Sequence, residues 1–74
     1  MATYTVVDEA YDVDVFSTFK ALCGRYYGSD WFLDDDRQRP CTNTSLRAEL
    51  RSVGEARIYD SEGGDWRYKV VVHK

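Results

Sequence analysis

EARIYDSEGGDWRYKVVVH, residues 55–73, is the stretch of this sequence that decides the fold. Residues 55–60 and 65–73 are rich in β-branched and aromatic side chains, which favour extended strands. The segment between them, residues 61–64, ends in two glycines, which suit the tight turn of a β-hairpin. The sequence therefore predicts two antiparallel strands joined by a short turn.

The rest of the chain predicts a third strand, a loop and a main helix. Residues 3–8 (TYTVVD) predict a third strand, and residues 28–43 predict a loop with room for a short extended piece at 31–33. Residues 15–27 predict the main amphipathic helix, because six apolar side chains recur at helical period. That stripe consists of Val15, Phe16, Phe19, Leu22, Cys23 and Tyr26.

Residues 44–53 fit two structures. Leu46, Leu50 and Val53 have helical spacing, but the segment also alternates at the period of a strand. Its leucine, arginine, alanine and glutamate are strong helix formers, so a helix is favoured. The predicted fold is α+β, with a three-stranded antiparallel sheet packed on one main amphipathic helix and a second short helix. Residues 1–74 are expected to form a single compact α/β domain.

Length and composition narrow the class of protein. A chain of 74 residues has a marginal core, but 15% aromatic residues supply large side chains to fill it. No signal peptide and no membrane span is expected, so the expected compartment is the cytoplasm. There Cys23 and Cys41 are expected to stay reduced, with Cys23 as a small core residue, although an oxidising compartment would allow a bridge between them.

Catalytic and metal-binding patterns are weak in this chain. A Cys–His nucleophile would have to use His73, which lies on a predicted strand near the C-terminus. The run Asp34–Asp36 lacks the alternating ligands, glycine and distal glutamate of a calcium loop, and zinc needs more cysteine or histidine than the chain holds. We therefore expect no enzyme activity, no metal and no cofactor.

Charge is unevenly distributed along the sequence. The net charge is −3, but residues 1–36 hold eight acids against two bases, a net −6, whereas residues 37–74 hold eight bases against five acids, a net +3. Two outcomes are open at this point. The halves either mix in space and neutralise each other, or they leave the molecule with polarised surfaces.

The basic side chains of the C-terminal strands raise nucleic-acid binding as an alternative function. Arg57, Arg67 and Lys69, with Tyr59 nearby, have the composition of a stacking and phosphate-binding sheet face. The net charge of −3 argues against this, because affinity for nucleic acid depends on neutralising phosphates. Ordinary solvent-facing residues explain the same pattern, so direct nucleic-acid binding stays the minority hypothesis.

The stretch from Tyr27 to Asp36 indicates protein binding. Trp31 and its apolar neighbours run directly into Asp34, Asp35 and Asp36. An aromatic anchor rimmed by charge is typical of interface hot spots, and the acids would steer the protein toward a basic partner. The alternative is that Trp31 closes one end of the core and the acids keep a loop soluble. Both can hold together, and the candidate partner-binding residues are Tyr27, Trp31, Asp34, Asp35 and Asp36.

A small, acidic, aromatic-rich chain with this strand and helix order and no catalytic pattern resembles inhibitors encoded by phages and mobile elements, of the anti-CRISPR and anti-restriction type. The resemblance rests on size, acidity and the predicted β-α-β-β order. It implies a non-enzymatic inhibitor in the host cytoplasm that occupies a basic surface of a larger host protein or ribonucleoprotein complex. No membrane partner is expected, and a homodimer stays open.

Overall fold

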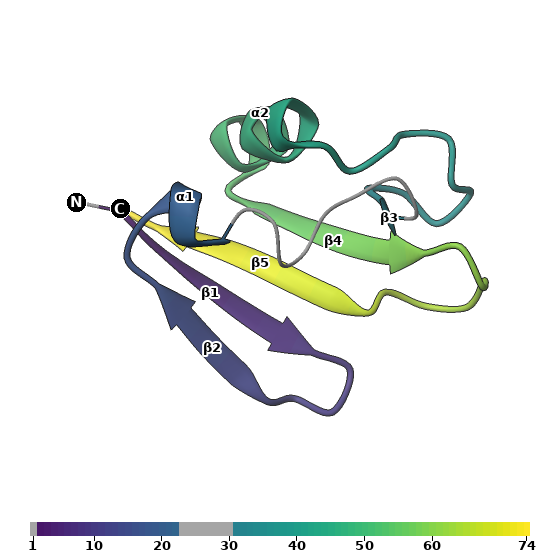
Figure 1. Ribbon diagram of the computed structural model, residues 1–74, viewed down its shortest axis with the longest axis horizontal. Coiled ribbons are helices and arrows are strands. Elements are labelled where there is room, and N and C mark those ends of the chain that lie inside the picture. The colour runs from purple at the N-terminus through teal and green to yellow at the C-terminus, as the bar shows by residue number, and fades with distance from the viewer. Residues whose placement is uncertain (1, 23–30) are drawn as a thin grey trace.

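The protein is a small α+β fold with one antiparallel sheet. The computed structural model describes residues 2–22 and 31–74. Within them the elements are β1 (Thr3–Asp8), β2 (Val13–Phe16), α1 (Phe19–Leu22), β3 (Trp31–Phe32), α2 (Asn43–Val53), β4 (Glu55–Asp60) and β5 (Tyr68–His73). The five strands lie in the order β2-β1-β5-β4-β3, and every neighbouring pair is antiparallel (Figure 1).

The predicted three-stranded sheet is wrong, because two further strands flank it. At one edge β2 occupies residues that were expected to begin the main helix. A tight turn sends the chain back along β1, and the Asp8 carboxylate holds it by accepting the backbone N–H groups of Ala10 (2.9 Å) and Asp12 (3.0 Å). Tyr11 takes the left-handed backbone conformation in this turn, with φ at 65°.

The predicted helix over residues 15–27 is wrong, because its first two residues belong to strand β2. Val15 is paired with Thr5 in the β1–β2 ladder and is 64% exposed, so it does not belong to a buried helical stripe. Adjacent residues of a strand point to opposite faces, and Phe16, the next residue, packs against the core. Only Phe19–Leu22 is helical within the described part of this segment, and residues 23–27 lie outside the described residues.

The other edge strand comes from the segment expected to be a loop. Trp31 pairs with Asp60 and Phe32 with Tyr59, which adds β3 to the edge of β4. The expected extended piece at 31–33 is thus confirmed as a strand over its first two residues. The final strand begins at Tyr68, three residues later than expected, because residues 61–67 form the turn that joins β4 to β5.

The helix favoured for residues 44–53 is confirmed as α2. At its start the Thr42 hydroxyl accepts the backbone N–H of Ser45 (3.1 Å), and the Ser45 hydroxyl accepts the backbone N–H of Thr42 (2.8 Å). This reciprocal arrangement is a capping box with serine in place of the usual acid. Gly54 ends the helix with φ at 89° and donates its N–H to the Leu50 carbonyl oxygen (3.0 Å).

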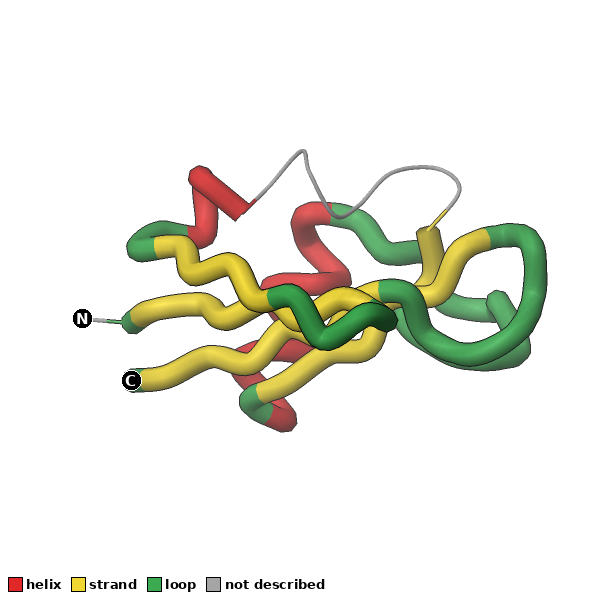
Figure 2. The backbone as a smooth tube through the Cα atoms, turned by 90° about the horizontal axis from the view of Figure 1, so that it is seen from below, coloured by secondary structure: helices red, strands yellow, loops and turns green. Residues whose placement is uncertain are grey.

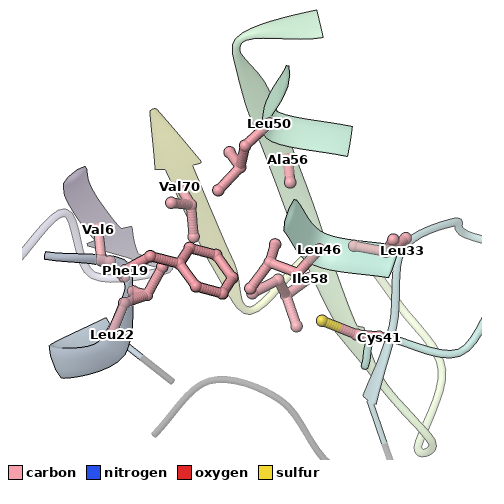
Figure 3. Packing of buried hydrophobic residues seen from close by; sticks show 10 residues of the cluster. All are labelled: Val6, Phe19, Leu22, Leu33, Cys41, Leu46, Leu50, Ala56, Ile58 and Val70. Carbon is pink, nitrogen blue, oxygen red and sulfur yellow. The ribbon is translucent and has the colours of Figure 1, made fainter. Parts of the chain in front are cut away.

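The core lies between the sheet and the two helices. Phe19 and Leu22 come from α1, and the other buried members come from α2, the strands and the loop before α2 (Figure 3). They are Val6, Leu33, Cys41, Leu46, Leu50, Ala56, Ile58 and Val70. Val6, Ala56 and Val70 are register neighbours on one face of the sheet. In Figure 2 the red tube of α2 passes behind the yellow strands, so the helix covers one face of the sheet.

The opposite face of the sheet carries the alternate residues. Val13 and Val15 of β2 are 57% and 64% exposed there, and Val71 of β5 is half-buried. Arg57 and Lys69 are register partners further along the same face. No helix within the described residues is long and apolar enough to cross a membrane.

Candidate functional site

Three turns that are distant in sequence meet at one end of the sheet. They are residues 8–12, 33–40 and 60–67, and Figure 1 shows them at the end of the molecule away from both termini. These segments hold nine acids against three arginines, a net charge of −6. We call this the acidic end; its acids are Asp8, Glu9, Asp12, Asp34, Asp35, Asp36, Asp60, Glu62 and Asp65.

Arg67 joins two of these turns. Its Nη1 contacts both carboxylate oxygens of Glu9, at 2.8 and 2.7 Å, and its Nε donates to Asp60 Oδ2 at 2.6 Å. Glu62 adds a longer ion pair at 3.8 Å. Glu9 and Arg67 are brought together because β1 and β5 are paired up to Asp8 and Tyr68. One guanidinium therefore gathers three carboxylates instead of offering a free positive charge.

Arg37 joins the third turn to the others. Its Nε donates to the Asp60 backbone carbonyl (2.9 Å) and its Nη2 to the Gly64 carbonyl (3.1 Å), while Nη1 contacts the Asp35 carbonyl within its own loop. The guanidinium carbon also lies 5.4 Å from the centre of the Tyr59 ring, a cation–π arrangement. Arg37 thus fixes the 33–40 loop against the β4–β5 turn, which makes the acidic end one continuous surface.

The three consecutive aspartates play different parts. Asp34 Oδ1 accepts the backbone N–H groups of Gln38 (2.9 Å) and Arg39 (3.1 Å), so this carboxylate shapes the loop. Asp35 and Asp36 are exposed to solvent at the tip. The apolar residues before the aspartates pack inward. Trp31 is half-buried against the core, and Leu33 is buried within it. The apolar residues anchor the loop and the last two acids are presented beside it.

A depression opens next to Trp31. It has a volume of about 340 Å³, and it is lined by Trp31, Tyr68, Asp8, Glu9, Ala10, Asp60 and Arg67. The Trp31 and Tyr68 rings lie 5.5 Å apart between centroids, inclined by 60°. Aromatic faces beside carboxylates form a favourable environment for an ammonium or guanidinium group. Arg67 already fills this role toward Glu9 and Asp60, so Asp8 is the lining carboxylate outside its ion pairs.

Hydrogen bonds to two carboxylates of the acidic end, Asp34 and Asp60, favour their ionised form. Partial burial alone would raise the pKa of Asp60 above its ordinary value of 3.8, but hydrogen bonds from the Arg67 guanidinium and the Glu62 backbone N–H outweigh it and lower that pKa. The pKa of Asp34 is likewise lowered, because burial is outweighed by the backbone N–H groups of Arg39 and Gln38 and by the charge of Arg39. Asp34 and Asp60 therefore hold their negative charge at neutral pH.

The predicted partner-binding residues are largely brought together. Asp34, Asp35 and Asp36 belong to the acidic end, and Trp31 lines the depression beside it. Tyr27 lies outside the described residues. Sequence reasoning missed Glu9, Asp60 and Glu62, which contribute as much charge as the aspartate triplet. The one available signal was the position of these acids in predicted connections, since turns at the same ends of paired strands come together.

Two of the residues predicted for a nucleic-acid face, Arg57 and Lys69, are register partners on the open sheet face, whereas Arg67 and Tyr59 are engaged elsewhere. Arg67 is held by three carboxylates, and Lys69 pairs with Glu55 at 3.6 Å. Tyr59 is only 9% exposed, with Arg37 over its ring, so it offers little surface on which a base could stack. Arg57 remains exposed on the open sheet face.

The described residues form no metal-binding cluster, and the comparisons with known proteins found no match. Across residues 2–22 and 31–74, no three side chains among histidine, cysteine, aspartate and glutamate are placed to hold a metal ion together. No protein-family model matches the chain, and neither does any curated protein or solved structure. The function is therefore inferred from the residues themselves.

Proposed function

We propose that this protein is a non-enzymatic binding protein whose acidic end docks on a basic surface of a larger protein or ribonucleoprotein complex. The observation that carries the proposal is the convergence of three acidic turns at one end of the sheet, two of which border the Trp31 depression. A concentrated negative field speeds association with a positive surface, and a desolvated aromatic residue supplies short-range affinity. Asp35 and Asp36 steer, and Trp31 with Tyr68 receives a basic side chain.

The biological form we propose is stoichiometric inhibition. A basic surface on a nucleic-acid-handling complex normally holds phosphates, so an acidic protein bound there competes with the nucleic acid. An anti-CRISPR or anti-restriction inhibitor acting in a host cytoplasm would work in this way. Catalysis is not part of the proposal, since Cys41 is fully buried and the chain's single histidine, His73, lies on an exposed strand end.

The test is a tagged pull-down from host lysate with two charge-matched variants. Asp35→Asn with Asp36→Asn removes two exposed acids, and Ser52→Lys with Val53→Lys adds two bases on exposed positions of α2; each double variant changes the net charge from −3 to −1. We expect the first variant to lose a partner that the wild-type protein and the second variant both retain. Circular dichroism of all three proteins checks that the fold is unchanged.

The same pull-down is repeated at two salt concentrations, and the eluate is examined for protein and for nucleic acid. Capture at about 50 mM salt should weaken at about 500 mM, where the screening length falls to only a few ångströms. Equal capture by both variants would overturn the proposal, because the acidic tip would then be irrelevant. Nucleic acid eluting without protein, and lost on Arg57→Glu with Lys69→Glu, would instead favour the sheet-face alternative.

A further inference from the structure

A second pocket lies at the other end of the sheet, where Ala2 and Lys74, close to the two termini, are part of its lining. It has a volume of about 210 Å³ and is formed where the start of β1 and the end of β5 meet α1 and α2. Its apolar lining is provided by Tyr4, Phe19, Leu50 and Val72. Tyr4 and Val72 are register partners on the helix-covered face of the sheet. The pocket is therefore built on the core and not on a surface loop.

Cations surround this apolar lining. Arg47, Arg51 and Lys74 all border the pocket. Arg47 and Arg51 are one helical turn apart on α2, where two like charges face each other and destabilise a helix. Within residues 2–22 and 31–74, no carboxylate forms an ion pair with any of the three, whereas Arg39, Arg67 and Lys69 are all paired. Among the described residues, the positive charge that borders this pocket has no acidic partner.

The position of Arg47 fits a binding role. Its guanidinium carbon lies 4.4 Å from the centre of the Phe19 ring, a cation–π contact that holds the group at the mouth of the pocket that Phe19 lines. Phe19 is in turn fixed by Tyr4, whose ring meets it edge-on at 5.8 Å. Arg51 lies in the last turn of α2 and complements the negative end of the helix dipole, but Arg47 is too far from that end for this explanation.

We propose that this pocket binds a small phosphate monoester with an aromatic body. The phosphate would lie between Arg47 and Arg51, which present the planar donor groups that phosphate recognition favours, and the ring would lie against Tyr4, Leu50 and Val72. This basic pocket is separate from the acidic end, and the proposal does not depend on the proposed partner. It adds a small-molecule site to a protein whose net charge is negative.

The test is a titration of the isotope-labelled protein, followed by amide NMR shifts in phosphate-free buffer. The probes are phenyl phosphate, adenosine monophosphate and inorganic phosphate. We expect saturable shifts at residues 4, 50 and 72 with the aromatic esters. Adenosine monophosphate binding more tightly than phenyl phosphate identifies a nucleotide, and the reverse identifies a smaller aromatic ester. Absence of saturable shifts with both esters overturns the proposal.

Matched single variants locate the site. Arg51→Gln and Arg57→Gln each remove one exposed arginine without an ion pair among the described residues, but only Arg51 borders the pocket. Loss of one charged hydrogen bond should weaken ester binding about tenfold in Arg51→Gln and leave Arg57→Gln unchanged. Equal weakening in the two variants, or equal affinity for inorganic phosphate and phenyl phosphate, contradicts the proposal. Arg47→Gln serves as a second test, with a thermal melt to check folding.

Discussion

Arg67 and Arg37 are the residues that turn three separate loops into one surface. Arg67 contacts carboxylates on the β1–β2 turn and on the β4–β5 turn, and Arg37 donates to two backbone carbonyls of the latter. The two arginines contact different kinds of acceptor. Arg37 satisfies carbonyl groups and adds order, whereas Arg67 offsets repulsion among acids that would otherwise face each other uncompensated.

A substitution at Arg67 measures that second effect. We expect Arg67→Met, which keeps the apolar stem, to lower the Tm by several degrees, because Glu9, Asp60 and Glu62 then repel one another. The matched change Glu62→Gln should alter the Tm little, since that carboxylate is 81% exposed and lies 3.8 Å from Arg67. Thermal melts at about 20 mM and 500 mM salt check both, with the Arg67→Met deficit shrinking at high salt. Similar melts for the two variants would contradict this account.

Asp60 predicts how stability depends on pH. Its folded-state pKa lies below the ordinary value of 3.8, so as the pH falls the unfolded chain takes up the proton first. The stabilisation from this carboxylate is complete above that ordinary value and is lost as the pH falls through the lower folded-state pKa. We expect the Tm difference between wild type and Asp60→Asn to be largest at neutral pH and to shrink as the pH falls below 3.8.

A matched control separates Asp60 from the general effect of acid. Asp35→Asn removes an exposed carboxylate of the same acidic end, whose side chain plays no part in the Arg67 cluster. Its Tm should follow the wild-type curve over the same pH range. If the Asp60→Asn difference stayed constant as the pH fell, the pKa of Asp60 would not be lowered by folding.

At the scale of elements, β2 is the decisive departure from the sequence pattern. The apolar residues of segment 13–16 suit either one helical face or the two faces of a strand, and the Asp8 turn selects the strand. A helix over 15–27 would have buried Val15, whereas pairing with β1 leaves it 64% exposed. The same segment then continues to Phe19, which α1 places in the core with 7% exposure.

These two positions give a sharp contrast. We expect Val15→Lys to change the free energy of unfolding by no more than about 0.5 kcal/mol, as for other exposed positions. Phe19→Ala should cost about 3–5 kcal/mol, because it empties a buried aromatic site. Urea unfolding followed by circular dichroism measures both. A large loss in Val15→Lys would mean that Val15 is buried, as the helical stripe implied.

The N-terminal cap formed by Thr42 and Ser45 accounts for where α2 begins. Thr42→Ala removes the hydroxyl that accepts the Ser45 N–H, and we expect it to lower the free energy of unfolding by about 1 kcal/mol. Thr42→Ser keeps an acceptor at the same place and should retain most of the stability. The same urea experiment compares the two. Equal losses would show that the threonine methyl, and not the hydroxyl, is what matters.

At the scale of the whole molecule, charge is polarised along the sheet. The turns on one side gather acids, and the pocket near the termini is bordered by Arg47, Arg51 and Lys74. This polarity is not the division into acidic and basic halves of the sequence, because residues 60–67 contribute to the acidic end. It gives the molecule two surfaces with opposite electrostatic preferences, one for each proposal.

The order of the strands makes a prediction for the whole fold. β1, β5 and β4 each have two neighbours in the sheet, whereas β2 and β3 lie at its edges. Amide hydrogens exchange slowest in elements that open only on global unfolding, so we expect the slowest exchange in β5, β1 and β4 and faster exchange in β2. Hydrogen exchange followed by NMR checks this. Protection of β2 equal to that of β5 would contradict the edge position.

Local sequence determined part of this protein, and tertiary pairing decided the rest. The β4–β5 hairpin and α2 follow from side-chain alternation, paired glycines and strong helix formers, which act between residues close in the chain. The edge strands did not follow, because a short apolar run is ambiguous until a neighbouring strand supplies its hydrogen bonds. The aspartate triplet and Trp31 were visible in the sequence, but Glu9 and Arg67 are 58 residues apart. Only the antiparallel pairing of β1 with β5 brings such residues into contact and makes the acidic end a single surface.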